Sequence, residues 1–178
     1  MKHILKSLFI LFILNSSASQ AEYTAVVIDA DNGKVLHEVS ATQPWFPASL
    51  TKVMTLYLAF NAIKSGLLKL DDTVPVSSYA SQQPNSKLGL IAGQMLTVQE
   101  AISAIITRSA NDAAVALAEK IGGTEAKFAT QMTSMARDLN MSTTTFYNAT
   151  GLPHSRQVTS SRDMALLASR VRSDFKEF

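Results

Sequence analysis

The sequence predicts an α+β fold in which a β-hairpin is followed by a series of helices. Two stretches rich in β-branched and apolar residues flank an Asn-Gly turn near the start of the chain. Beyond them, apolar residues recur at helical spacing, and two capping sequences mark helix starts. The length of 178 residues suggests one domain, and 47% apolar with 17% charged residues is typical of a globular protein.

Residues 1–21 have the pattern of a secretory signal peptide. Two lysines make the start basic, an unbroken apolar run follows, and Ser19-Gln20-Ala21 is a small-x-small cleavage pattern. An uncleaved anchor is the alternative, but the apolar run is well short of the roughly 20 residues that a spanning helix needs. We therefore expect cleavage after Ala21, export to the periplasm or the cell-wall side of the membrane, and a mature domain over 22–178.

The composition of the mature chain excludes several classes of function. From Glu22 onward the chain has 14 basic and 14 acidic residues, and this balance does not favour a nucleic-acid partner. The absence of cysteine excludes disulfides, thiolate metal sites, cysteine nucleophiles and a lipoprotein anchor. The three histidines are scattered without a His-x-x-x-His pair, so we expect no metal site and surface positions for the histidines.

The N-terminal part of the mature chain is predicted to form a hairpin and then a buried helix. The hairpin pairs 23–29 with 34–39, and a loop broken by two prolines follows over 40–48. Residues 49–65 are apolar on nearly every face after Lys52, which is typical of a buried helix. Gly66 is a plausible end for it.

The rest of the chain is predicted to be mainly helical after a loop-rich stretch over 67–95. Capping sequences and apolar periodicity locate the helices. The expected elements are a helix that starts at Thr97 and breaks at 107–111, a continuation over 112–121, an amphipathic helix over 124–139, a loop over 143–157 and a last helix that begins at Ser160.

Ser49 and Lys52 are the first candidate catalytic pair. They stand three residues apart at the start of the buried helix, so both side chains lie on one face. Serine needs a base beside it, and a lysine amine can serve when burial keeps it neutral. The N–H groups of a helix start would suit an oxyanion. Ser-x-x-Lys also occurs by chance and Ser49 could be a helix cap, yet a buried amine without a purpose would be costly.

Ser109-Ala110-Asn111 is the second candidate. It falls in the predicted break between two helices, where short polar side chains can point into a cleft. A hydroxyl and an amide there could hydrogen-bond Lys52 and hold a peptide substrate. Helix capping before Asp112 is the alternative interpretation.

The order Ser-x-x-Lys and then Ser-x-Asn resembles that of penicillin-binding proteins and serine β-lactamases. Residues 47–55 (PASLTKVMT), 108–117 (RSANDAAVAL) and 148–168 (NATGLPHSRQVTSSRDMALLA) are similar to the D-alanyl-D-alanine carboxypeptidases, a peptidase S11-like family of low-molecular-weight penicillin-binding proteins. The likeness covers nearly all of 23–178. It implies a β-lactamase/transpeptidase-like fold, with a helical region beside an antiparallel sheet.

The resemblance also implies roles for the four candidate residues. Ser49 would be the acyl-ester nucleophile and Lys52 its general base. Ser109 would relay a proton toward the leaving D-alanine, and Asn111 would bind the lysine and the substrate peptide. The implied reaction removes the terminal D-alanine of peptidoglycan stem peptides, in cell-wall biosynthesis and cell shape. β-Lactam antibiotics would inhibit it by leaving a long-lived acyl-enzyme, and no metal or organic cofactor would be needed.

The third motif of the family, Lys-Thr-Gly, does not occur in this sequence. In the family it lies on a sheet strand, where it binds the substrate carboxylate, and that strand supplies the second oxyanion-hole N–H. The predicted hairpin offers only two strands, and an isolated hairpin is marginal in water. We therefore expect a C-terminally truncated catalytic domain over 22–178 that lacks the last strands of the sheet, is poorly stable alone and is impaired in catalysis.

Three rival interpretations remain open at this point. A class A β-lactamase would need a glutamate for deacylation, but no acidic residue lies between Asp138 and Asp163, and the middle motif is Ser-Ala-Asn rather than Ser-Asp-Asn. An inert or merely peptidoglycan- or β-lactam-binding fragment is favoured by the missing motif and disfavoured by the intact Ser49 and Lys52. An exported helical protein with chance motifs is disfavoured by the extent of the resemblance.

Overall fold

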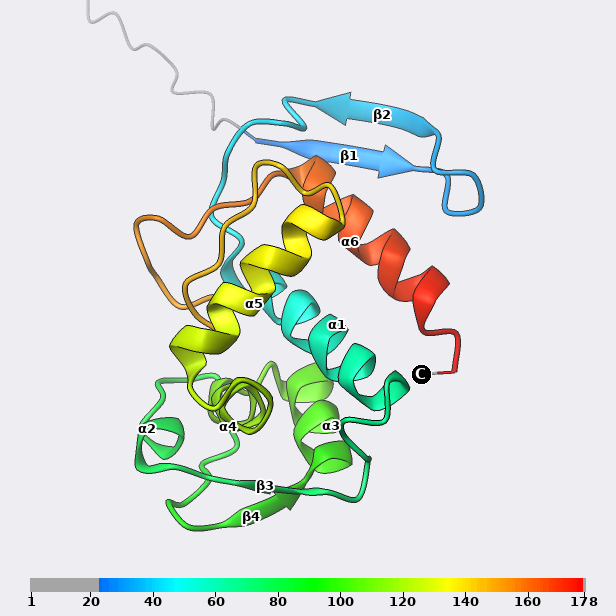
Figure 1. Cartoon of the computed structure of the whole chain (residues 1–178). Helices are drawn as coiled ribbons and strands as arrows, with labels where there is room; N and C mark the ends of the chain where they lie inside the picture. Colours follow the sequence, from blue (N-terminus) through cyan, green and yellow to red (C-terminus); the bar gives the residue numbers. More distant parts are fainter. Residues whose placement is uncertain (1–22, 178) are drawn as a thin grey trace, which may run out of the picture.

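The computed structural model describes residues 23–177, so the expected signal peptide lies outside the described residues. Figure 1 shows a β-hairpin at one end, a central group of helices, and a second two-stranded ribbon at the opposite end. The predicted α+β class is confirmed. Within 23–177, no helix combines the length and apolar character that crossing a membrane would require.

The N-terminal hairpin forms as predicted. Strand β1 (Ala25–Ile28) pairs antiparallel with β2 (Val35–Val39), and β1 packs on α6 (Ser161–Asp174). The turn is held by the Asp29 carboxylate, whose Oδ1 accepts the N–H of Asp31 at 2.9 Å. The first four residues of β2 are exposed, so this ribbon has little cover beyond the contact with the helix.

The buried helix is α1 (Thr51–Lys64), and a 3₁₀ turn over Ala48–Leu50 precedes it. Nine of its 14 residues are buried. In the described chain this helix is covered mainly by α4 (Asn111–Gly122), α5 (Glu125–Asp138) and α6. Gly66, at φ +76°, ends the helix in a left-handed conformation that only glycine adopts without strain.

The loop-rich stretch contains three short elements that the sequence did not reveal. Strand β3 (Thr73–Pro75) pairs antiparallel with β4 (Met95–Thr97), and α2 (Ser78–Ser81) lies between them in the chain. Three-residue strands are too short to show a period of two, and a long loop separates this pair. Burial of the facing Val74 and Leu96 is what defines the ribbon.

The predicted break in the middle helical region is confirmed. Helix α3 (Val98–Arg108) starts with a capping box in which the Thr97 hydroxyl accepts the Glu100 N–H and the Glu100 carboxylate accepts the Thr97 N–H. Ser109 then takes the left-handed conformation at φ 50° and stops α3. Helix α4 (Asn111–Gly122) resumes at once, and its first eight residues are all buried.

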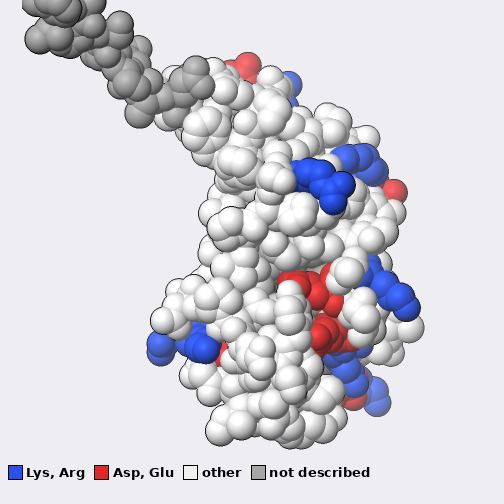
Figure 2. Space-filling view, turned by 90° about the vertical axis from the view of Figure 1, so that its left-hand side faces the viewer, with Lys and Arg blue, Asp and Glu red and all other residues white. Residues whose placement is uncertain are grey.

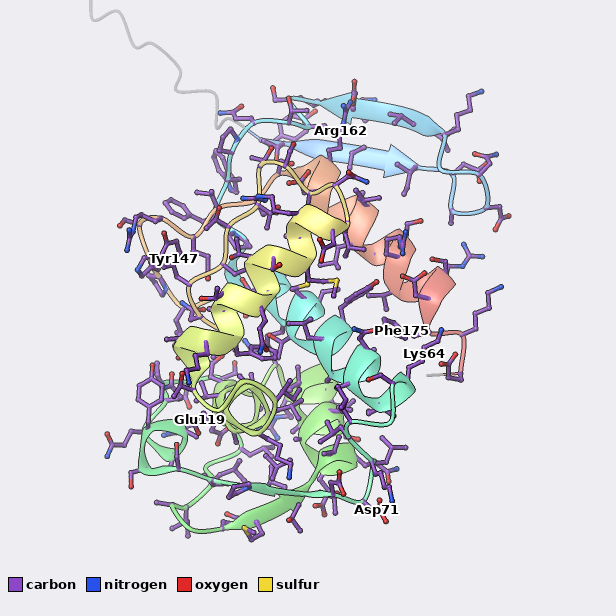
Figure 3. All side chains as sticks on the ribbon, in the orientation of Figure 1. Lys64, Asp71, Glu119, Tyr147, Arg162 and Phe175 are labelled. Atoms are coloured by element: carbon purple, nitrogen blue, oxygen red, sulfur yellow. The ribbon has the colours of Figure 1, made fainter. Side chains whose placement is uncertain are left out.

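The last two helices enclose α1. Helix α5 (Glu125–Asp138) follows a Thr124 cap, and α6 follows a Ser160 cap, both as predicted. After α6, the buried Phe175 ring packs edge-on against Tyr57, with centroids 4.9 Å apart. Figure 3 shows Phe175 next to Lys64, whose Nζ donates to the Asp174 carbonyl at 2.6 Å. The C-terminal end of α1 is therefore fastened to the end of α6.

Candidate active site

Ser49 and Lys52 lie together at the start of α1, as the spacing predicted. The 3₁₀ turn presents Ser49 at the surface, while Lys52 is only 4% exposed. The Lys52 Nζ lies 3.4 Å from the Ser49 Oγ and donates to the Thr150 carbonyl oxygen at 2.6 Å. An exposed hydroxyl is thus in hydrogen-bond reach of a buried amine, which is the geometry of a serine and its general base.

Burial lowers the pKa of Lys52 from 10.5 to about 8. Loss of water disfavours the ammonium form, and among the described residues no acidic side chain forms an ion pair with it to offset that cost. About a tenth of the amine is therefore neutral at pH 7, and a neutral amine can accept the proton of Ser49.

A segment over 149–151 holds this pair from the side of the loop before α6. The Thr55 hydroxyl donates to the Ala149 carbonyl at 2.8 Å, one turn of α1 beyond Lys52. Gly151 follows at φ +86°, and a Cβ placed on it would lie 1.7 Å from the Ala48 carbonyl oxygen. No other residue fits here, because both the φ angle and the contact with the serine turn require glycine.

The backbone beside the nucleophile is itself unusual. Ala48 has φ 47°, which places a non-glycine residue in the left-handed region directly before Ser49. Such a conformation costs about 1 kcal/mol or more and persists where the surroundings enforce it. The N–H of Leu50 donates to the Pro47 carbonyl and that of Thr51 to the carbonyls of Ala48 and Ser49, so these donors beside the serine are already bonded within the turn.

The α3–α4 junction carries the second pair of candidate residues, Ser109 and Asn111. Asn111 is buried; its backbone N–H donates to the Ser86 carbonyl at 2.7 Å, and its Nδ2 donates to the Pro84 carbonyl at 2.9 Å. The half-buried Ser109 hydroxyl makes no hydrogen bond within 23–177. Lys52 bonds neither residue; its two partners are Ser49 and Thr150. The expected contact between Asn111 and the lysine is absent from the described chain.

Asp112 fixes the loop on which Asn111 rests. This carboxylate is fully buried and accepts the backbone N–H groups of Leu88, Gly89 and Leu90 at 2.9–3.0 Å. It is also near the N-terminus of α4, where the helix dipole favours a negative charge. The sequence analysis treated Asp112 only as the start of a helix, and nothing in the local pattern reveals its distant backbone partners.

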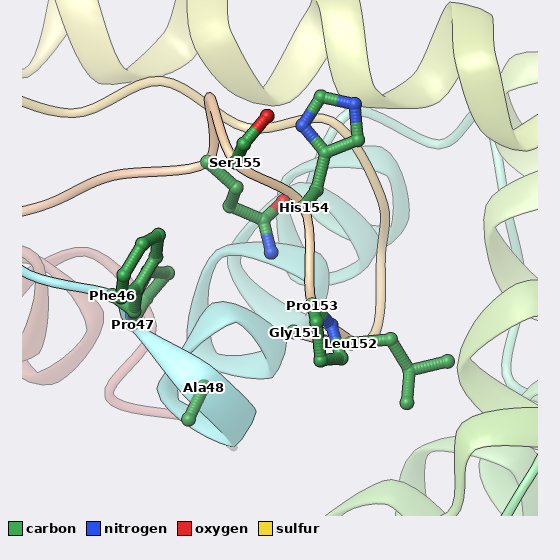
Figure 4. A pocket seen from close by; sticks show the side chains of 9 residues that line it. Phe46, Pro47, Ala48, Gly151, Leu152, Pro153, His154 and Ser155 are labelled. Carbon is green, nitrogen blue, oxygen red and sulfur yellow. The ribbon is translucent and has the colours of Figure 1, made fainter.

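A pocket of about 380 Å³ opens beside the serine turn. Figure 4 shows Ala48 on one side of it and the Gly151–Pro153 segment on the other. Its lining is almost wholly apolar and is made by Phe46, Pro47, Ala48, Gly151, Leu152, Pro153, His154, Ser155 and Gln157. The pocket therefore offers an apolar wall next to Ser49.

Several residues of the site were not singled out from the sequence. Thr150 contributes only its carbonyl, which no side-chain pattern can reveal. Asn148 orders the segment because its Oδ1 accepts the N–H of Gly151 at 2.8 Å and the Nε2 of Gln157 at 3.2 Å. Of these residues, only Gly151 is recognisable from the sequence, because it is a loop glycine within one of the stretches that carry the resemblance.

The face of the molecule seen in Figure 2 does not gather one sign of charge. On the face seen in Figure 2, Lys and Arg side chains lie in separate groups, a small acidic group lies near the middle, and most of the surface is uncharged. A ligand of this face would be recognised by shape and hydrogen bonds more than by long-range attraction.

A family model described as D-alanyl-D-alanine carboxypeptidase (Peptidase S11) matches residues 14–178. This chain belongs to that family. The family explains why the Ser49–Lys52 pair and the Ser109–Asn111 motif occur in this order, and it agrees with the resemblance inferred from the sequence.

Known relatives agree with this family. The D-alanyl-D-alanine carboxypeptidase DacF of Bacillus subtilis is 38% identical over 83% of this chain and 38% of its own length. The crystal structure of DacD from Francisella tularensis superposes with a TM-score of 0.85 at 38% identity, over 86% of this chain and 37% of that one. Penicillin-binding protein D2 of Listeria monocytogenes, solved in an ampicillin-bound form, superposes with a TM-score of 0.72 at 33% identity, over 86% of this chain and 63% of that one.

These structural relatives confirm the penicillin-binding, transpeptidase-like fold, of which the chain represents a part. It spans less than half the length of DacF and of DacD. One Lys-x-Gly sequence does occur after Ser109, at Lys120-Ile121-Gly122, but it lies at the end of α4 rather than on a strand. It is therefore no substitute for the third motif.

Proposed function

We propose that this protein is a serine-type D-Ala-D-Ala carboxypeptidase that works outside the cytoplasm through an acyl-enzyme on Ser49. The observation that carries the proposal is the buried Lys52 amine, 3.4 Å from an exposed serine hydroxyl and with its pKa lowered to about 8. The signal-peptide pattern of 1–21 supports export, and peptidoglycan stem peptides are the substrates that the family implies.

In the first step, Lys52 Nζ takes the proton of Ser49 while Oγ attacks the carbonyl carbon of the terminal D-Ala-D-Ala bond. The carbonyl oxygen becomes an oxyanion, for which the backbone N–H of Ser49 is the proposed donor. The C–N bond then breaks, and the departing amine of D-alanine receives the proton, with Ser109 as the proposed relay from Lys52. Asn111 holds the peptide through the oxygen of its side-chain amide.

In the second step, a water molecule attacks the ester and Lys52 takes its proton. The bond between the acyl carbon and the Ser49 Oγ then breaks, Oγ receives the proton from Lys52, and the shortened peptide leaves. A β-lactam enters the same first step, but the opened ring stays attached and no amine departs. The apolar pocket beside Ala48 and Gly151 supplies a wall for the ligand's apolar groups.

The test is acylation by a fluorescent penicillin, measured by the intact mass of the chain over 22–178. The expected result is one adduct of the penicillin mass, located on Ser49 by peptide mapping and lost in Ser49→Ala. Ser65→Ala is a matched control, because Ser65 caps the far end of α1. A folded chain that forms no adduct, or an adduct that survives in Ser49→Ala, would overturn the proposal.

The second candidate function is a binding protein without turnover. One observation favours it: within 23–177, the N–H groups of Leu50 and Thr51 beside Ser49 are already bonded to carbonyls of the serine turn. Loss of a single oxyanion-hole donor already reduces the rate by roughly 10²–10³. Release of D-alanine from a peptide ending in D-Ala-D-Ala separates the two functions, since the binding protein forms the Ser49 adduct with penicillin but releases no D-alanine.

A further inference from the structure

Glu125 is a buried carboxylate that the reaction above does not use. It is the first residue of α5, and only 9% of it is exposed. Its Oε1 accepts the backbone N–H of Ala149 at 2.9 Å, and its Oε2 accepts the Tyr79 hydroxyl at 2.8 Å. Both oxygens are therefore committed to groups from other parts of the chain, one of which belongs to the segment that holds the catalytic pair.

The contacts continue from Ala149 to the amine. The Ala149 carbonyl accepts the Thr55 hydroxyl at 2.8 Å, and the next carbonyl, that of Thr150, accepts Lys52 Nζ at 2.6 Å. Glu125 thus holds the N–H of Ala149, and α1 holds the carbonyls of Ala149 and Thr150. Only the φ and ψ angles of two residues separate the Ala149 N–H from the Thr150 carbonyl, so loss of the Glu125 contact would free this short stretch of backbone to move that carbonyl.

The chemistry of Glu125 suits an anchor. A carboxylate at the first position of a helix is stabilised by the helix dipole, so its charge can remain buried there. Hydrogen bonds to an ionised acceptor are about twice as strong as neutral ones. The carboxylate holds the segment over 149–151 more firmly than a neutral side chain would.

We propose that Glu125 is a positioning residue that fixes the Thr150 carbonyl against Lys52 and thereby keeps the amine buried beside Ser49. This inference rests on the proposed function, since it assigns Lys52 as the base. Glu125 touches no reacting atom and acts only through the backbone of Ala149 and Thr150.

Loss of the Glu125 contact should raise the pKa of Lys52. Among the described residues its partners are a hydroxyl and a carbonyl, and burial is the cause of its lowered pKa. When the segment over 149–151 moves away, water reaches the amine and the pKa rises from about 8 toward 10.5. Each unit of increase reduces the neutral fraction about tenfold at pH 7.

The experiment follows the Lys52 side chain directly, by NMR titration of its Cε signal in the full chain, alongside acylation by the fluorescent penicillin. Four variants separate the length of the side chain from its charge. Glu125→Asp keeps the charge but is one methylene shorter, and Glu125→Gln keeps the length without the charge. Glu125→Ala removes both, and Tyr79→Phe removes the hydroxyl that donates to Glu125 while leaving the contact with Ala149. Circular dichroism establishes that each variant is folded.

We expect the titration midpoint to rise by about one unit in Glu125→Asp and Glu125→Ala, with about tenfold slower acylation at pH 7. Glu125→Gln and Tyr79→Phe should stay within about threefold of the wild type, because a neutral acceptor or the unchanged carboxylate still holds Ala149. If Glu125→Ala does not fold, the titration midpoint of Lys52 in Glu125→Asp tests the proposal alone.

A wild-type midpoint in folded Glu125→Asp would overturn the role of Glu125. The titration needs no acylation, so it separates this failure from that of the proposed function. A chain that forms no Ser49 adduct but shows the shifted midpoint would refute the function and leave the anchoring of Lys52 intact.

Discussion

Two parts of the candidate site are built to different degrees. At the start of α1, Ser49, Lys52 and the Thr150 carbonyl are joined by contacts of 3.4 and 2.6 Å. At the α3–α4 junction, the Asn111 amide nitrogen donates to the Pro84 carbonyl, and the Ser109 hydroxyl is without a hydrogen bond in the part of the chain that the structure describes. The serine and the buried amine are thus joined to each other, whereas Ser109 and Asn111 make no hydrogen bond to either of them.

This difference teaches which part of the proposed reaction the fold prepares in advance. Activation of Ser49 would depend on burial of one amine, which packing alone provides. Under the proposed mechanism, contacts to a departing D-alanine form only when a peptide is bound. Substitutions that displace Ser49 or Lys52 should therefore affect acylation most, and substitution of Asp112, which touches neither residue, should affect chiefly stability.

Gly151→Ala is expected to have the largest effect. The new Cβ would lie 1.7 Å from the Ala48 carbonyl oxygen, so the serine turn or the segment over 149–151 must shift. A displacement on the order of 1 Å at a catalytic group costs about 100-fold in rate. Gly93→Ala is the matched control, because Gly93 has the same φ of +86° with no atom within 4 Å. Penicillin acylation at equal rates in the two variants would contradict the prediction.

Acylation should depend steeply on pH. Lys52 accepts a proton only as the neutral amine, and its pKa of about 8 means that this form increases as the pH rises toward that value. The rate should rise about 50-fold between pH 6 and pH 8 and level off above pH 9. The check is the rate of adduct formation in a series of buffers, with circular dichroism at each pH. A flat profile over that range would show that Lys52 is not the base.

Asp112→Ala tests the α3–α4 junction and the loop that rests on it. The substitution leaves the buried N–H groups of Leu88, Gly89 and Leu90 without their acceptor, which should reduce the free energy of unfolding by about 2 kcal/mol. Denaturant unfolding measures this loss. Asp71→Ala is the control, since Asp71 is exposed, and it should change stability by less than about 0.5 kcal/mol. Equal effects of the two substitutions would mean that the loop does not depend on Asp112.

The smallest effect is expected at Thr51, whose fully buried hydroxyl has no hydrogen-bond partner. Thr51→Val replaces that hydroxyl by a methyl group and should stabilise the chain by about 1 kcal/mol. Thr55→Val is the matched change on the same helix, but its hydroxyl donates to Ala149, so it should destabilise by about 1 kcal/mol. Opposite signs in denaturant unfolding support the assignment of the two hydroxyls, and a shared sign contradicts it.

The sequence predicted the parts of the molecule that local rules govern. The Asn-Gly hairpin, the Thr97–Glu100 capping box, the break at Ser109 and the ending of α1 at Gly66 all follow from neighbouring residues, and all are confirmed. The Ser49–Lys52 contact follows for the same reason, because three residues on a helix share a face.

The rest depended on contacts between distant residues. The β3–β4 ribbon, the cover of α1 by helices, and the carboxylates of Asp112 and Glu125 are defined by partners far away in the chain. A backbone carbonyl such as that of Thr150 has no sequence signature at all. The expected bond between Asn111 and Lys52 is not among the hydrogen bonds of the described residues, in which Lys52 donates to Ser49 and Thr150 and the Asn111 amide nitrogen to Pro84.

The fastening of α1 at both ends has a consequence for the nascent chain. Its N-terminal half is held by Ala149 and Thr150 and its C-terminal end by Asp174 and Phe175, all about one hundred residues or more downstream. At synthesis rates of about 5–20 residues per second, this apolar helix is made roughly 5–20 s before the residues that hold it. During that interval its apolar surface is open to the wrong contacts, so chaperone protection of newly made chains should centre on residues 51–64.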